Sequence, residues 1–115
     1  MEPELDLNRL RELQTLLNAE LPAIVRTLLD ELTRATDEIE AAMAQGDLAA
    51  VALATHAARN SGLMLDARPL LGALADIETG ARNHDRDVAC AGLIRLRAAW
   101  PPLRHRLEAE AATPD

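Results

Sequence analysis

Apolar residues recur at three- and four-residue steps through most of the chain, which is the spacing of one face of an α-helix. Asp6 is a suitable N-cap for a short first helix, whose apolar side consists of Leu7, Leu10, Leu13 and Leu17. Pro22 then suits the first turn of a second helix, because its missing N–H group would have no partner within the helix there. The pattern therefore predicts a short N-terminal helix followed by a second helix.

The second helix is expected to run to Ala44, with most of its acidic residues opposite an apolar side made of Ile24, Leu28, Leu32, Ala35, Ile39 and Met43. Gly46 fits the left-handed position just beyond a helix end, and Asp47 fits the N-cap of the next helix. A third helix is therefore predicted over residues 48–64.

A fourth helix is predicted after Asp66, which can cap it, with an apolar side made of Leu70, Leu71, Leu74 and Ile77. We expect this helix to end near Gly80 or Asn83, two residue types that are common beyond helix ends.

The turn sequence NHDRD precedes a fifth helix, expected from about Asp87 toward Glu108. Pro101 and Pro102 lie within it, and a proline removes a helical hydrogen bond and clashes with the preceding turn, so we expect a kink or break there. Residues 109–115 are expected to form a frayed tail.

Short connections join these segments and force neighbouring helices to be antiparallel. The predicted fold is all-α: an antiparallel up-down four-helix bundle with an additional short N-terminal helix. A chain of 115 residues has room for one domain. Residues 1–115 are therefore expected to form a single domain with a core over about residues 5–108.

Composition supports a helical fold, because 49% of the residues are hydrophobic but only one, a tryptophan, is aromatic. The formal net charge is −7, and the imbalance is local: residues 1–47 hold 11 acidic and 4 basic side chains, whereas residues 48–115 hold 8 of each. An acidic chain without a basic stripe argues against nucleic acid or an anionic membrane as partner. A protein or a small molecule is the expected partner.

Other features of the sequence point to a cytoplasmic protein without membrane insertion. Cys90 is the single cysteine and cannot form an internal disulfide, no signal peptide opens the chain, and no apolar run approaches the roughly 18 residues of a membrane span. His84 and His105 lack ligand spacing to a second histidine or to the cysteine, so no metal site is expected.

His56 is the residue with the most interesting chemistry. On a helical wheel it lies about a third of a turn from the core sector, which comprises Leu48, Val51, Thr55, Ala58, Gly62 and Leu65. The imidazole is therefore expected at the accessible edge of the bundle, with Arg59 close by at i+3. A neutral imidazole can attack phosphorus, and a guanidinium can bind phosphoryl oxygens. A single histidine on a helix is nevertheless more often a surface residue without a function.

The helix order and the residues around position 56 resemble the histidine-containing phosphotransfer (HPt) family of bacterial phosphorelays. Its motif is approximately His-x-x-Lys-Gly-small-small in mid-helix, and the corresponding residues here are His56, Arg59, Asn60, Ser61 and Gly62. A turn with Asp66 and Ala67 and the leucine-rich sequence RPLLGALADIE follow, and the likeness covers about residues 5–108. Arg59 stands where the family has lysine, Asn60 where it has glycine, and Asp66 where it has a turn glycine.

The resemblance implies a carrier without kinase activity of its own, in which His56 accepts a phosphoryl group from the aspartyl phosphate of one receiver domain and passes it to another. No cofactor is implied for this chain, because the receiver holds the Mg²⁺. Arg59, Asn60 and Ser61 would stabilise the phosphoryl group. The receiver of a response regulator or hybrid sensor kinase would contact a monomer at Ala49, Ala52, Leu53 and Leu63.

Two alternatives compete with this interpretation. The chain could be a non-catalytic helical adaptor that binds a receiver or sensor kinase without accepting phosphate, and Asn60 is the feature that favours this. The dimerisation region of a sensor kinase fits less well, because an acidic residue usually follows the histidine there, whereas Ala57 follows it here. A two-helix hairpin would also not need five segments.

Overall fold

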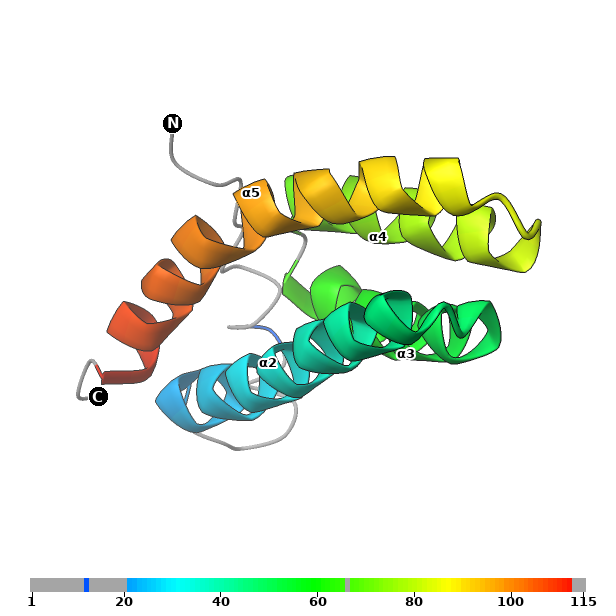
Figure 1. Ribbon diagram of the computed structural model, residues 1–115. Coiled ribbons are helices and arrows are strands. Elements are labelled where there is room, and N and C mark those ends of the chain that lie inside the picture. Colours follow the sequence, from blue (N-terminus) through cyan, green and yellow to red (C-terminus); the bar gives the residue numbers. More distant parts are fainter. Residues whose placement is uncertain (1–11, 13–20, 66, 113–115) are drawn as a thin grey trace.

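The described part of the chain is entirely helical. The computed structural model describes residue 12, residues 21–65 and residues 67–112. In these residues there are four helices and no strand: α2 (Leu21–Gln45), α3 (Leu48–Leu65), α4 (Arg68–Arg82) and α5 (Arg86–Ala112) (Figure 1). The prediction of an all-α fold is confirmed. The predicted N-terminal helix near residues 7–17 lies outside the described residues.

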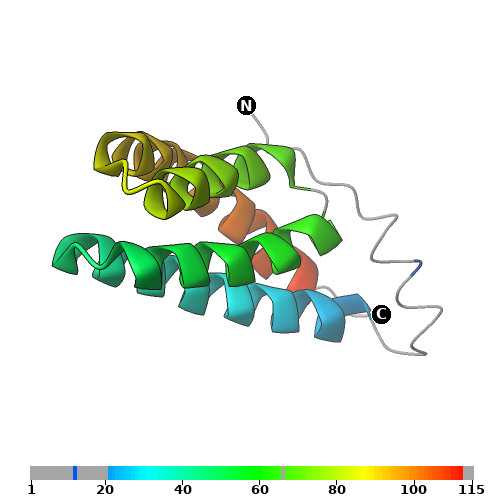
Figure 2. The ribbon, with the colours of Figure 1, turned by 90° about the vertical axis from the view of Figure 1, so that its right-hand side faces the viewer.

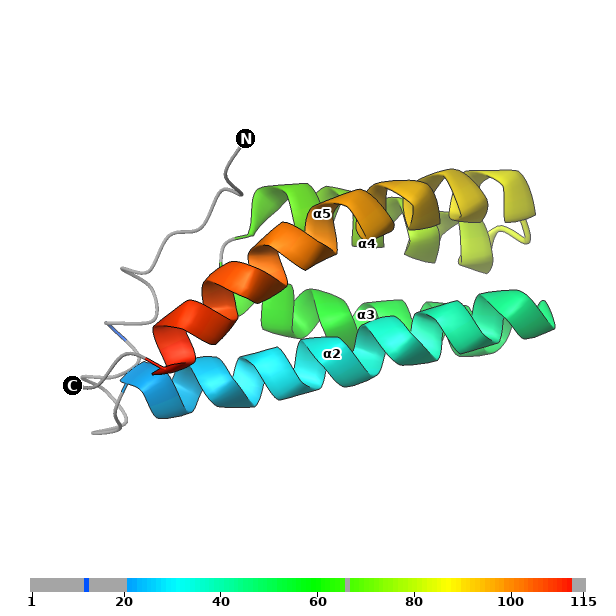
Figure 3. The same cartoon turned by 60° about the vertical axis from the view of Figure 1, so that its left-hand side comes forward.

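The four helices pack as a bundle around one aliphatic core. Helix α2 contacts α3, α3 contacts α4, α4 contacts α5, and α5 contacts α2, and Figures 2 and 3 show the pairs α2–α3 and α4–α5 side by side. The core is filled by branched aliphatic side chains that are almost fully buried, including Leu32, Ile39, Leu74, Ile77 and Leu96. None of the helices in the described residues is both long and apolar enough to cross a membrane.

The connection between α2 and α3 has the predicted chemistry. Gly46 has a φ of 72°, the left-handed conformation that glycine adopts at low cost. The carboxylate of Asp47 accepts a hydrogen bond of 3.1 Å from the backbone N–H of Ala50, so Asp47 is the N-cap of α3. These two residues place the start of α3, and therefore set which of its residues face the core.

The start of α4 differs from the prediction. Its N-cap is Ala67, which makes no side-chain capping bond, and Pro69 lies in the first turn. Asp66, which we expected to cap the helix, lies outside the described residues. The C-terminal end of α4 agrees with the prediction, because Asn83 occupies the C-cap position after Arg82.

Helix α5 continues through Pro101 and Pro102, so a break is not observed. Figure 1 shows the helix changing direction between its orange and red parts, and a bend agrees with the expected kink. The helix persists because Trp100 and Leu103, on either side of the two prolines, are both buried against the core. Burial of apolar surface on both sides outweighs the lost hydrogen bonds.

The expectation of a frayed tail from residue 109 is wrong for residues 109–112, which belong to α5. Ala111 is buried, and its carbonyl accepts a hydrogen bond of 3.1 Å from Nη2 of Arg26 on α2. This contact ties the last turn of α5 to the first turns of α2. Residues 113–115 lie outside the described residues.

Candidate functional site

His56 lies near the middle of α3, on the side away from the core. Its side chain is 60% exposed, whereas the residues that α3 buries include Val51, Thr55, Ala58 and Leu65. The helical wheel therefore assigns both the core side and the exposed side of α3 correctly, although Leu48 is only half-buried.

A carboxylate from α4 lies beside the imidazole. Oε2 of Glu78 is 3.4 Å from Nδ1 of His56, and the Glu78 side chain is only 6% exposed. The same carboxylate accepts a hydrogen bond of 2.8 Å from Nη1 of Arg59 at Oε1 and pairs with Nη2 of Arg82 at 2.6 Å through Oε2. One buried carboxylate thus joins the imidazole and two guanidinium groups, and we call these four residues the Glu78 cluster.

The two arginines keep Glu78 ionised. Burial alone would raise the pKa of its carboxyl group, but the hydrogen bond from Arg59 and the charge and hydrogen bond of Arg82 outweigh burial, and the net pKa is lowered. With a neutral imidazole, the Glu78 cluster carries two positive charges and one negative charge. The site therefore presents a net positive charge beside an exposed ring nitrogen, which favours an anionic group there.

The position of Glu78 also orients the imidazole ring. An ionised carboxylate only accepts hydrogen bonds, so it favours the tautomer in which Nδ1 carries the proton. Nε2 then holds the lone pair. At 3.4 Å the contact is longer than an ordinary N–H···O hydrogen bond of about 2.7–3.2 Å, so the orienting interaction is a weak one.

The structure brings two of the three expected phosphoryl-stabilising residues to this edge of α3. The Arg59 guanidinium binds Glu78, the carboxylate that also faces His56, and the Arg59 side chain is 40% exposed. Asn60 is exposed one turn after His56.

Ser61 lies elsewhere, because residues five apart on a helix differ in direction by about 140°. It is buried, and its hydroxyl donates a hydrogen bond of 2.9 Å to Glu31 on α2. The structure therefore does not bring Ser61 to His56, and its partner is a residue of α2.

The expected contact residues flank His56 along α3. Ala49, Leu53 and Leu63 are exposed, and Ala52 is half-buried. Leu53 is 76% exposed, which makes it the most exposed large hydrophobic side chain among the described residues. We call the exposed residues of this helix the outer face of α3: Ala49, Leu53, His56, Ala57, Asn60 and Leu63. Apart from the imidazole it carries no titratable group.

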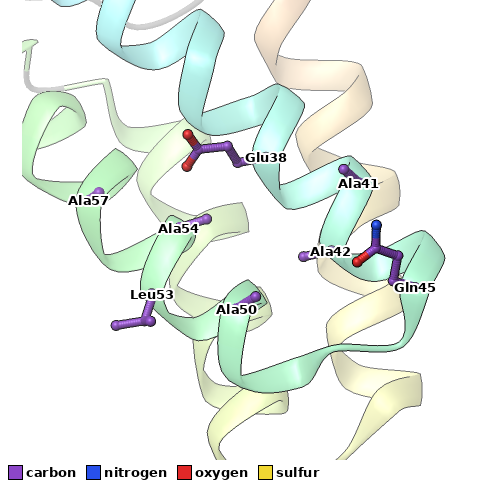
Figure 4. Close-up of a pocket in the computed structure, with 8 residues that line it drawn as sticks. All are labelled: Glu38, Ala41, Ala42, Gln45, Ala50, Leu53, Ala54 and Ala57. Carbon is purple, nitrogen blue, oxygen red and sulfur yellow. The ribbon is translucent and has the colours of Figure 1, made fainter.

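A shallow groove of about 430 Å³ between α2 and α3 adjoins this face. Its floor is made of alanines, among them Ala42, Ala50 and Ala54. Figure 4 shows Glu38 extending from α2 over the space between the helices, and Leu53 pointing away from α2. Because these side chains are small, the surface beside His56 is recessed on the side of the groove. A partner can therefore approach the imidazole ring from the groove between α2 and α3.

Glu78 is the site residue that sequence reasoning missed. A signal for it exists, because Glu78 follows Ile77 and lies one turn after Leu74, which places a charge on the apolar side of the fourth helix. Arg82 at i+4 is a suitable partner for such a carboxylate.

In the part of the chain that the structure describes, no three histidine, cysteine, aspartate or glutamate side chains are grouped so that they could hold a metal ion. Comparison of the chain with family models, with curated proteins and with solved structures finds no match.

Proposed function

We propose that this chain is a histidine phosphotransfer protein of the HPt type, which relays a phosphoryl group between aspartates of receiver domains through His56. The observation that carries the proposal is an exposed imidazole in mid-helix whose Nδ1 faces a buried carboxylate, 3.4 Å away. This leaves Nε2 as the nucleophilic atom. The resemblance of the sequence around His56 to the HPt motif supports the same assignment.

The proposed step is a direct displacement at phosphorus. The Nε2 lone pair of His56 attacks the phosphorus of an aspartyl phosphate, the P–O bond to the aspartate breaks, and the aspartate carboxylate leaves. Nδ1 keeps its proton throughout, and the positive charge that develops on the ring faces Glu78. The reverse step delivers the phosphoryl group to the aspartate of a second receiver. The chain needs no kinase activity for this, and the receiver supplies the Mg²⁺.

Two side chains are suited to stabilise the transferred group. The Arg59 side chain is 40% exposed, so donors that do not bind Glu78 can reach phosphoryl oxygens. Asn60 offers an exposed amide donor one turn from His56. Ser61 has no part in the proposal, because its hydroxyl binds Glu31.

The proposed docking surface for the receiver is the outer face of α3. Its apolar and small side chains allow the reacting atoms to approach to about 3 Å, and its lack of carboxylates avoids repulsion of an aspartyl phosphate. The proposal includes an antiparallel up-down arrangement of the helices, which their short connections favour. It also includes a cytoplasmic monomer as the working form.

The test is phosphoryl transfer from a panel of phosphorylated receiver domains to the purified chain. We expect an acid-labile, alkali-stable label on the wild type and none on His56→Gln. The matched controls are His84→Gln and His105→Gln, since both of these histidines are also exposed, and both variants should be labelled like the wild type. Equal labelling of His56→Gln and the wild type would overturn the proposal.

A non-catalytic adaptor remains the second candidate because of Asn60. This exposed side chain stands where the HPt motif has glycine, close to where a receiver's active site would have to approach. The adaptor predicts receiver binding that survives His56→Ala and no label from any receiver of the panel. Label on His56 would exclude it.

A further inference from the structure

His56, Arg59 and Arg82 all face the carboxylate of Glu78, but they contact its two oxygens at different distances. Oε1 is occupied by Arg59 at 2.8 Å. Oε2 is shared, because Arg82 binds it at 2.6 Å while Nδ1 of His56 lies 3.4 Å from the same atom. Arg82 has the short contact and the imidazole has the long one.

We propose that Arg82 is a positioning residue that restrains the reactivity of His56 by competing with it for Oε2 of Glu78. The part of this inference that concerns reactivity rests on the proposed function, but the competition for Oε2 does not. When Arg82 is bound, Glu78 orients the imidazole only weakly. When Arg82 is absent or drawn away, Oε2 is free to accept a full hydrogen bond from Nδ1.

Removing Arg82 has one consequence for the ring that the geometry supports. A shorter hydrogen bond from Nδ1 to an ionised carboxylate raises the electron density of the ring and makes Nε2 a better nucleophile. The change therefore predicts a more reactive His56.

Arg59 does not have this role, although it binds the same carboxylate. It occupies the other oxygen, and its Nε is buried without a hydrogen-bond partner, so its guanidinium is partly sequestered together with Glu78. Arg82 is the last residue of α4 and is 60% exposed. Its removal therefore leaves Glu78 with one guanidinium partner and does not create an unpaired buried charge.

The test combines a spectroscopic and a chemical measurement on the full chain. The variants are Arg82→Gln, Arg82→Lys and, as control, Arg104→Gln. The control breaks a second i,i+4 arginine–glutamate pair, that of Arg104 with Glu108 on α5, in which both side chains are exposed. ¹⁵N–¹H spectra of the imidazole groups report the Nδ1 hydrogen bond of His56. Labelling by phosphoramidate, a small phosphoryl donor that needs no receiver, reports the reactivity of Nε2.

We expect Arg82→Gln to move the His56 Nδ1 proton downfield and to accelerate labelling by about 3- to 10-fold, the size expected for one improved hydrogen bond. Arg82→Lys, which keeps a cation near Oε2, should return toward wild-type behaviour, and Arg104→Gln should not differ from the wild type. An unchanged Nδ1 signal in folded Arg82→Gln would overturn the inference, as would an equal change in Arg104→Gln.

The two measurements also separate this inference from the proposed function. A downfield shift in Arg82→Gln without labelling of any protein would support the competition for Oε2 and count against the phosphotransfer role. Receiver-dependent labelling of the wild type with no response to Arg82→Gln would leave the phosphotransfer role standing and overturn the inference.

Discussion

Nδ1 of His56 lies 3.4 Å from Oε2 of Glu78, so the exposed imidazole of α3 contacts a carboxylate that is buried on α4. Glu78 belongs to both the fold and the candidate site. It neutralises charge at the contact between α3 and α4 through Arg59, and its carboxylate faces Nδ1 of the imidazole. Changes at this carboxylate should therefore affect stability as well as chemistry.

Glu78→Gln is expected to lower the free energy of unfolding by about 1–3 kcal/mol, because the arginines that face this position lose a charged acceptor in a buried setting. Urea unfolding at pH 7 measures the change. The control is Glu108→Gln, which breaks the exposed pair with Arg104 and should alter stability by less than about 0.5 kcal/mol. Similar values for the two variants would mean that the Glu78 cluster contributes little to the fold.

Two helical glycines should respond in opposite directions to alanine. A Cβ at Gly92 on α5 would lie 2.7 Å from Cγ1 and 2.9 Å from the backbone N of Ile77 on α4, so Gly92→Ala must push the two helices apart. We expect a loss of about 2 kcal/mol or more. A Cβ at Gly72 would meet nothing within 4 Å, so Gly72→Ala should gain about 0.5–1 kcal/mol from helix propensity. Thermal unfolding of both variants tests the close packing of α4 on α5.

Features that depend on local chemistry were predictable from the sequence. Gly46 and Asp47 end one helix and begin the next through their own backbone and side-chain preferences. The exposure of His56 follows from the 3.6-residue period once its helix is located. In both cases the information lies within a few residues of the chain.

Contacts between helices were harder to predict, because they depend on how two helices are placed and rotated against each other. The wheel of one helix does not indicate that Ser61 binds Glu31 on α2 or that Arg59 binds Glu78 on α4. The continuation of α5 past Pro101 also depends on contacts with other helices. Burial of Trp100 and Leu103 there overrides the tendency of proline to end a helix.

Stability should decline in acid partly through Glu40. Arg97 donates two hydrogen bonds to this carboxylate, at 2.8 and 2.6 Å. These bonds lower the pKa of Glu40, and burial opposes them only in part. Since the folded pKa lies below the unfolded one, the stabilisation is present above the unfolded pKa, about 4.3, and is lost as the pH falls through the folded pKa.

Urea unfolding of the wild type and Glu40→Gln at pH 7, 5, 4 and 3 checks this expectation. The wild type should be the more stable protein at pH 7, and the difference should shrink toward pH 3. Because both side chains of the pair are substantially exposed, the difference should be small and should weaken in high salt. A difference that grows in acid would contradict the assigned sign.

Ser61→Ala should affect the fold and leave the chemistry unchanged. The variant removes the hydroxyl that donates to Glu31, and we expect a loss of about 0.5–1.5 kcal/mol in urea unfolding. Labelling of His56 by phosphoramidate should stay at the wild-type rate. Asn60→Ala should show the reverse, with unchanged stability and slower labelling. Slower labelling of Ser61→Ala would restore a phosphoryl-stabilising role for that residue.

The last prediction concerns the proposed docking surface. Leu53 is 76% exposed on the outer face of α3, one turn before His56, so Leu53→Glu removes nothing from the core and should change stability by less than about 0.5 kcal/mol. At a receiver interface, the same change would place a desolvated carboxylate near an aspartyl phosphate. We expect receiver affinity to fall by about tenfold or more.

Ile94→Glu is the matched control, because Ile94 is 65% exposed but lies on α5, away from the outer face of α3. Titration of each variant with a receiver that labels the wild type measures the affinity, and phosphoramidate labelling measures the intrinsic reactivity of His56. Weaker binding of Leu53→Glu with unchanged phosphoramidate labelling would place the receiver on α3, because only docking would then be affected. Equal loss of affinity in both variants would instead reflect net charge and argue against the outer face of α3 as the docking surface.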